Sequence, residues 1–113
     1  MERTVTCAAL STLVADRVKI ALLDVRRQPA FDADPRLIPG AVWQDPERVG
    51  TWAATLNRNQ RVVVYCVHGH EVSRGVVDHL RGLGIEAALL EGGIEAWKAA
   101  GGPVTVASGG AGS

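Results

Sequence analysis

The sequence predicts an α/β domain with a mostly parallel central sheet that is covered by helices on both faces. Two observations lead to this fold class. Short continuous apolar runs at 20–25, 61–65 and 87–90 are typical of strands that are buried on both faces. Segments with apolar residues at helical spacing separate these runs, and strands that alternate with helices favour a parallel sheet with right-handed crossovers.

Helices are predicted wherever apolar residues recur at a period near 3.6. The expected helical segments are 7–15, 28–33, a helix that starts at Asp45-Pro46, 72–83, and a last helix through Ile94 and Trp97. Thr6 and Asp45 are suitable N-caps, and Gly84 suits a helix C-terminus. A further short strand is expected at 41–43. The helix after Asp45 has an apolar stripe made of Val49, Trp52, Ala53 and Leu56.

Length and composition limit the class of protein. The chain has 113 residues, of which 47% are hydrophobic, so we expect one domain over residues 1–106 with a Gly/Ser-rich flexible tail at 107–113. Twelve basic residues balance twelve acidic ones, which gives no indication of nucleic-acid or membrane binding. No apolar stretch approaches the ~18 residues of a membrane span, and the first residues lack a secretion signal. We therefore expect a cytoplasmic protein.

Cys66 is the strongest candidate for a functional residue. It follows the apolar strand 61–65 and precedes a glycine-containing segment and then the helix 72–83. A thiol in this position stands at the carboxyl edge of the sheet, where open α/β folds bind ligands. It also faces backbone N–H groups and the positive end of a helix, which favour thiolate over thiol. This arrangement predicts a nucleophilic cysteine.

Four sequence blocks in order resemble the rhodanese-like sulfurtransferases. The blocks are Leu23-Asp24-Val25-Arg26, Ile38-Pro39-Gly40-Ala41, Val64-Tyr65-Cys66 with its glycine loop, and Leu90-Glu91-Gly92-Gly93-Ile94-Glu95-Ala96-Trp97. The likeness runs from about residue 5 to residue 106. It implies a three-layer rhodanese-like fold and a domain that needs no metal or organic cofactor.

The resemblance also implies an activity. In such enzymes the cysteine takes a sulfane sulfur from a donor such as thiosulfate, becomes a persulfide, and passes the sulfur to a thiophilic acceptor, which can be a small molecule or a protein. Cys66 would be the catalytic residue. The expected substrate-binding residues are Val67, His68, Gly69, His70, Glu71, Val72 and Arg26. Asp24 and Ser73 are expected to give structural support, and Arg26 is equally compatible with a structural ion pair and with a substrate-facing charge.

The loop departs from the family pattern in charge and in length. Many relatives have basic residues where this chain has Val67 and Glu71, and a carboxylate that faced the loop would repel thiosulfate. Small residues often stand where this chain has Val72, with Ser73 one position later, so the loop is expected to be one residue longer. Longer loops occur in related phosphatases and arsenate reductases, which makes an oxyanion enzyme an alternative. Those enzymes have an arginine at the position of Val72, and without it phosphoryl transfer loses its main charge stabiliser.

Two further hypotheses concern the same loop. A rhodanese-like sensing or interaction module, with Cys66 as a redox switch and little turnover, would also explain the absent loop arginine. A soft metal site made of Cys66, His68 and His70 is a minor alternative, because three side chains rarely converge from such tight spacing. Cys7 is expected to be a small buried residue of the first helix. A disulfide between the two cysteines is not expected in a reducing compartment.

Overall fold

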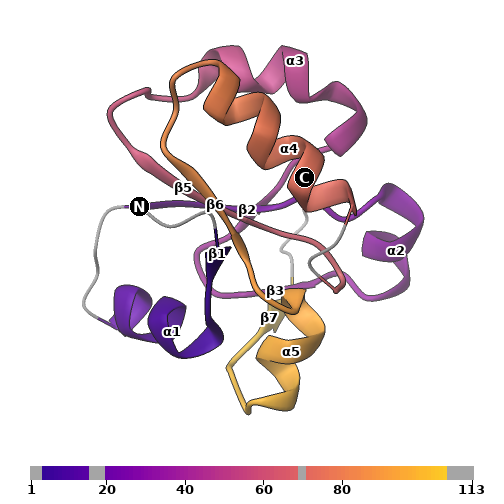
Figure 1. Cartoon of the computed structure of the whole chain (residues 1–113). Coiled ribbons are helices and arrows are strands. Elements are labelled where there is room, and N and C mark those ends of the chain that lie inside the picture. The colour runs from indigo at the N-terminus through magenta and orange to yellow at the C-terminus, as the bar shows by residue number, and fades with distance from the viewer. Residues whose placement is uncertain (1–3, 16–19, 69–70, 107–113) are drawn as a thin grey trace.

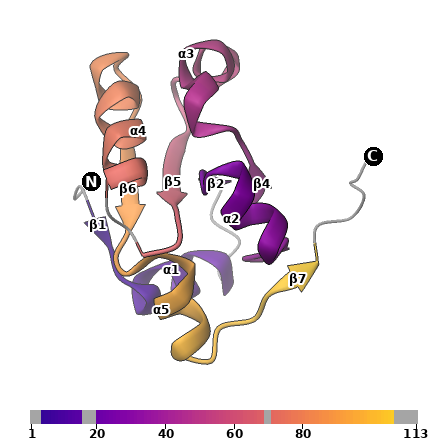
Figure 2. The ribbon, with the colours of Figure 1, turned by 90° about the vertical axis from the view of Figure 1, so that its right-hand side faces the viewer.

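The computed structural model describes residues 4–15, 20–68 and 71–106. Within them, a five-stranded sheet has the order β1-β6-β5-β2-β4, and all of its adjacent strands are parallel (Figures 1 and 2). Its strands are β1 (Thr4–Val5), β2 (Ile20–Asp24), β4 (Val42–Trp43), β5 (Arg61–Tyr65) and β6 (Ala87–Leu90). A separate antiparallel pair consists of β3 (Arg36–Leu37) and β7 (Thr105–Val106). The predicted α/β class and parallel sheet are confirmed.

Helices cover both faces of this sheet (Figure 1). The helices are α1 (Cys7–Ala15), α2 (Gln28–Ala33), α3 (Val49–Trp52), α4 (Glu71–Gly82) and α5 (Gly93–Ala99), with 3-10 turns η1 (Pro46–Arg48) and η2 (Ala53–Thr55). One buried cluster joins α3 and α4 to β2, β5 and β6, and includes Trp52, Val76 and Leu80. The opposite cluster joins α1 and α5 to the sheet through Leu10 and Trp97. Alternate residues of the strands supply the two cores, which explains their continuous apolar sequence.

Most predicted elements lie where the sequence places them. The α1 and α2 ranges match the predictions, and α4 starts and ends one residue earlier than predicted. Thr6 caps α1, because its Oγ1 accepts a hydrogen bond from the backbone N–H of Ala9 at 3.0 Å. Gly84 has a φ of +82°, a left-handed conformation that often follows a helix and that glycine adopts without strain. The proposed tail at 107–113 lies outside the described residues.

The prediction of one continuous helix after Asp45 was wrong, although the start of the helical segment was predicted correctly. Asp45 does accept a hydrogen bond from the N–H of Glu47 at 2.9 Å, so the predicted start is confirmed. However, the segment forms η1, α3 and η2 in succession rather than one helix. Gly50 and Thr51 are poor helix formers, and the Trp52 indole N–H donates to the carbonyl of Asp45 at 2.7 Å, which draws the segment back on itself. Trp52 and Ala53 are still buried, as their place in the stripe predicts.

The register of β2 against β5 brings two loops together. Asp24 is the partner of Tyr65, and the N–H of Val25 donates to the carbonyl of Tyr65 at 2.8 Å. The residues that follow β2 therefore lie beside Cys66, which follows β5. In Figure 2 the arrowheads of β5 and β6 point the same way, and α5 lies on the side toward which they point. This carboxyl edge is where parallel sheets bind ligands.

Candidate active site around Cys66

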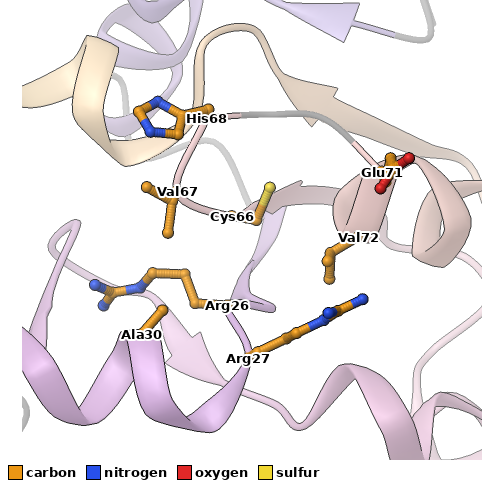
Figure 3. Close-up of a pocket in the computed structure, with 8 residues that line it drawn as sticks. All are labelled: Arg26, Arg27, Ala30, Cys66, Val67, His68, Glu71 and Val72. Atoms are coloured by element: carbon orange, nitrogen blue, oxygen red, sulfur yellow. The ribbon is translucent and has the colours of Figure 1, made fainter.

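Cys66 lies at a hollow on the carboxyl edge of the sheet. The hollow has a volume of about 280 Å³ (Figure 3). Its lining residues come from the β2–α2 segment and from the segment that starts at Cys66: Arg26, Arg27, Ala30, Cys66, Val67, His68, Glu71 and Val72. Cys66 is not part of a disulfide, and only 7% of the residue surface is exposed. A nearly buried thiol that still borders a hollow can meet a small substrate while excluding most water.

The hydroxyl of Ser73 is a polar contact of the thiol. The Sγ of Cys66 donates to the Oγ of Ser73 across 3.3 Å, and Ser73 is fully buried in α4. A hydroxyl can rotate from acceptor to donor, so the same contact can stabilise the thiolate. The first turn of α4 therefore supports the sulfur through a side chain as well as through the helix dipole.

The start of α5 fixes the backbone at the cysteine. The N–H of Ile94 donates to the carbonyl of Cys66 at 3.0 Å, and the N–H of Glu95 donates to the carbonyl of Val67 at 3.1 Å. Gly93 allows this approach. It has a φ of +64°, and a Cβ on it would collide with the carbonyl oxygen of Val67. The start of α5 thus orients the first two residues of the cysteine loop, a role that the sequence block Leu90–Trp97 does not by itself reveal.

Arg26 and Asp24 form a buried pair next to the hollow. The Nε of Arg26 donates to both carboxylate oxygens of Asp24, and the terminal nitrogens donate to the carbonyls of Asp34 and Arg36 at 2.8 and 2.9 Å. The Trp43 indole donates to the carbonyl of Arg26 at 2.8 Å. This is the geometry of a structural ion pair, one of the two possibilities left open for Arg26. A direct contact of Arg26 with substrate stays a prediction.

The buried Asp24 is also tied to β5. Burial raises the pKa of the Asp24 carboxyl above its usual range, while the hydrogen bonds and charge of Arg26 oppose this shift. The Tyr65 side chain hydrogen-bonds to Asp24, and its hydroxyl accepts from the N–H of Ile38 at 3.2 Å. Burial, followed by the charge of Asp24, raises the pKa of Tyr65. These contacts join β2, β5 and the segment at Ile38 below the hollow, and the charged groups of Asp24 and Arg26 stay buried.

The structure places several of the predicted site residues at the hollow. Val67, His68, Glu71 and Val72 line it, and Glu71 is exposed. Gly69 and His70 lie outside the described residues, so the converging loop amides, the loop length and the Cys66-His68-His70 metal hypothesis stay untested predictions. Among the described ranges, no three His, Cys, Asp or Glu residues are grouped so that they could hold a metal ion.

Arg27 is a lining residue that the sequence interpretation missed. It directly follows Arg26 and precedes α2, so its place after β2 at the carboxyl edge was the available signal. Figure 3 shows that the side chains of Arg26 and Arg27 extend in opposite directions, with Arg27 passing toward Val72. Neighbouring arginines with different surroundings are hard to tell apart from sequence, because the path of a loop decides which one is buried.

Known proteins similar to this chain share its fold over nearly all of its length. A family model described as "Rhodanese-like domain" matches residues 6–100. A rhodanese-related protein from Thermoplasma volcanium is 26% identical, with a TM-score of 0.81, covering 94% of this chain and 100% of the other. A rhodanese-like domain protein from Staphylococcus aureus is 24% identical, with a TM-score of 0.79, covering 95% of this chain and 100% of the other.

A third similar structure bears a different description. It comes from Rhodopseudomonas palustris and is described as a protein of unknown function and possible tyrosine phosphatase. It is 24% identical, with a TM-score of 0.81, covering 91% of this chain and 84% of the other, a likeness that shows the fold alone. No curated protein matches the chain. None of the helices in the described ranges has the length and apolar character needed to cross a lipid bilayer.

Proposed function

Because this chain belongs to the rhodanese-like domain family, we propose that it is a sulfurtransferase in which Cys66 carries the transferred sulfur. The observation that carries the proposal is the position of Cys66, a thiol outside any disulfide that lines the hollow after β5 and has a serine hydroxyl 3.3 Å from its sulfur. The proposal needs no metal or organic cofactor. It places the protein in the cytoplasm, where reducing conditions keep both cysteines as thiols.

Sulfur capture begins with the thiolate of Cys66, since the thiol is a poor nucleophile. The thiolate attacks the sulfane sulfur of thiosulfate, and a bond forms between Sγ and that sulfur. The bond between the sulfane sulfur and the sulfonate sulfur breaks, and its electron pair leaves with sulfite. The product is a Cys66 persulfide with the same net charge as the thiolate. The Ser73 hydroxyl and the N–H groups at the start of α4 and its loop stabilise this charge before and after transfer.

Sulfur release regenerates the enzyme. A thiophilic acceptor such as cyanide attacks the outer sulfur of the persulfide, forms thiocyanate, and returns the electron pair of the S–S bond to Sγ of Cys66. The balance needs no oxidant or reductant. Because the Cys66 hollow opens to the surface, the physiological acceptor can be either a small thiol or a thiol carried by a protein.

The test is thiosulfate:cyanide sulfurtransferase activity of three proteins, combined with their intact mass after exposure to thiosulfate. The wild type is expected to form thiocyanate and to gain about 32 Da, the mass of one sulfur atom carried on a nucleophilic cysteine. Cys66→Ser is expected to lose both. Cys7→Ser is the matched control and is expected to retain both within about twofold, because Cys7 lies in a separate hollow with Trp97.

Two other outcomes would replace this proposal. A folded wild type that gains one sulfur but does not turn over would favour a sulfur-sensing or interaction module. A wild type that gains no sulfur but hydrolyses an aryl phosphate or reduces arsenate through Cys66 would favour the oxyanion alternative, to which the description of the Rhodopseudomonas palustris structure points. The chain has Val72 in place of the arginine expected for that chemistry, so we expect no such activity.

A further inference from the structure

The hollow at Cys66 continues into a second hollow along α4. The second hollow has a volume of about 190 Å³ and is lined mainly by apolar side chains of η1, α3 and α4. Arg27 and Val72 line both hollows, so the two are neighbours and Arg27 stands at their border. A substrate whose sulfur reaches Cys66 therefore has its remaining atoms within reach of Arg27.

Arg27 is the lining arginine whose charge is available. Arg26 is 3% exposed and its guanidinium is committed to Asp24 and to two backbone carbonyls. Arg27 is exposed, and within the described ranges its side chain makes no hydrogen bond or ion pair. A guanidinium is charged at every working pH and can bind two oxygens of one anion at the same time.

The two carboxylates that line the hollows would repel an anionic donor, so binding of such a donor calls for a cation. Glu71 lines the first hollow and Glu47 lines the second, and both carboxylates repel a dianion such as thiosulfate. Val67 and Val72 add no charge. His68 also borders the first hollow, but Figure 3 shows its ring beyond Val67, away from Arg27. Backbone N–H groups can stabilise the single negative charge on the cysteine sulfur. The sulfonate end of thiosulfate carries further negative charge, which a cation would stabilise.

We propose that Arg27 binds the anionic, non-transferred end of the sulfur donor and so acts as a specificity-determining residue for sulfur capture. This inference rests on the proposed sulfurtransferase function. During capture, the electron pair of the broken S–S bond departs with sulfite, and Arg27 holds the sulfonate oxygens before and after that step. The adjoining hollow leaves room for leaving groups larger than sulfite. The site therefore selects donors whose leaving group is an oxyanion, and it disfavours neutral polysulfides.

The first experiment measures binding without turnover. Isotope-labelled Cys66→Ser protein is titrated with sodium thiosulfate and followed by NMR, and the dissociation constant is compared among three variants made in this background. Arg27→Gln is expected to weaken thiosulfate binding about tenfold, as expected for one lost charge-assisted contact, while Arg27→Lys retains most of it. Arg61→Gln is the matched control, because Arg61 is an exposed arginine at the opposite end of β5. The inference is overturned if Arg27→Gln binds like Arg61→Gln, or if no variant binds thiosulfate.

The second experiment separates sulfur capture from sulfur release in proteins that retain Cys66. Arg27→Gln is expected to raise the KM for thiosulfate about tenfold. Its preformed persulfide is expected to transfer sulfur to dithiothreitol, a neutral acceptor, at the wild-type rate. Equal loss in both half-reactions would contradict a role in donor binding. If the wild type forms no persulfide yet Arg27 governs thiosulfate binding, the proposed function fails and the Arg27 site stands. If turnover is normal and independent of Arg27, the proposed function stands and the proposed role of Arg27 fails.

Discussion

Cys7 and Cys66 each follow a parallel strand at the carboxyl edge of the same sheet, and each stands at or just before the start of a helix. Cys7 is the first residue of α1, after β1, and Cys66 precedes α4, after β5. By position alone, both thiols should gain from a helix N-terminus. The groups that contact the two sulfurs nevertheless differ, and we expect this difference to affect which sulfur reacts.

The thiol of Cys7 faces groups that favour the protonated form. Its Sγ donates to the carbonyl of Glu91 across 3.9 Å, a group that can only accept. Burial raises the pKa of the Cys7 thiol, and the charge of the Glu91 carboxylate raises it further. The thiol of Cys66 faces the hydroxyl of Ser73, which can donate as well as accept. The comparison teaches that position at a helix N-terminus does not by itself decide how reactive a thiol is, because the groups that contact the sulfur also matter.

Gly93→Ala is expected to have the largest effect, because it breaks the support that only Cys66 has. The new Cβ would meet the carbonyl oxygens of Val67 and Cys66, and alanine disfavours the φ of +64°. We expect the free energy of unfolding to fall by about 2–5 kcal/mol and sulfur capture to fall more than tenfold. Chemical denaturation and persulfide formation followed by mass spectrometry measure the two effects. Gly50→Ala, which adds a Cβ where nothing lies within 4 Å, is the control. An unchanged rate would show that α5 does not set the loop.

Ser73→Ala is expected to make Cys66 more like Cys7 without removing its place in the fold. Loss of the hydroxyl should lower the rate of sulfur capture about tenfold, since a hydrogen bond to a charged group contributes about 1.5 kcal/mol or more. The measurement is the rate of Cys66 alkylation by iodoacetamide, a neutral reagent that reports the nucleophilicity of the sulfur. A merely structural role would change the melting temperature and leave the alkylation rate as it is.

Glu91→Gln is expected to have the smallest effect. It should make the reactivity of the Cys7 thiol more similar to that of Cys66. Removing the carboxylate removes the second-largest cause of the raised pKa, so a larger fraction of Cys7 is thiolate at a given pH. Burial, the first cause, remains, and we therefore expect the alkylation rate of Cys7 at pH 7.5 to rise only about two- to threefold. The Cys66→Ser background keeps the second thiol from contributing. Glu86→Gln, near the opposite end of β5, provides the control, and equal rates in both variants would exclude Glu91 as a cause.

The fold was predictable because its signals are local and agree with one another. The strands have continuous apolar runs, Thr6 caps α1, and Gly84 ends α4, all of which can be read along the chain. The short pairings of β1, β3 and β7 were not predicted, since two-residue strands have too few residues for a period. The break in the helix after Asp45 also escaped prediction, because it depends on the contact of Trp52 with the Asp45 carbonyl.

A site residue could be predicted from the sequence only where a reactive residue type occurs at a position that is typical of active sites. Cys66 combines a reactive residue type with a strand end, and the sequence alone marks it. Arg26 and Arg27 are chemically identical neighbours, and only the path of the chain shows that the first is buried against Asp24 while the second borders the hollows. The contact of Gly93 with the cysteine loop joins segments far apart in sequence, so no local pattern could reveal it.

The hydrogen bonds from α5 to the cysteine loop have a consequence for the growing chain. Protein synthesis proceeds from the N-terminus, so Cys66 leaves the ribosome before Ile94 and Glu95, whose N–H groups hold the carbonyls of Cys66 and Val67. A nascent chain that has exposed β5 and α4 already contains the thiol but not the helix that orients its loop. The site is thus complete only after α5 docks, and a premature stop before Gly93 would leave Cys66 without the backbone contacts that the proposed sulfur transfer uses.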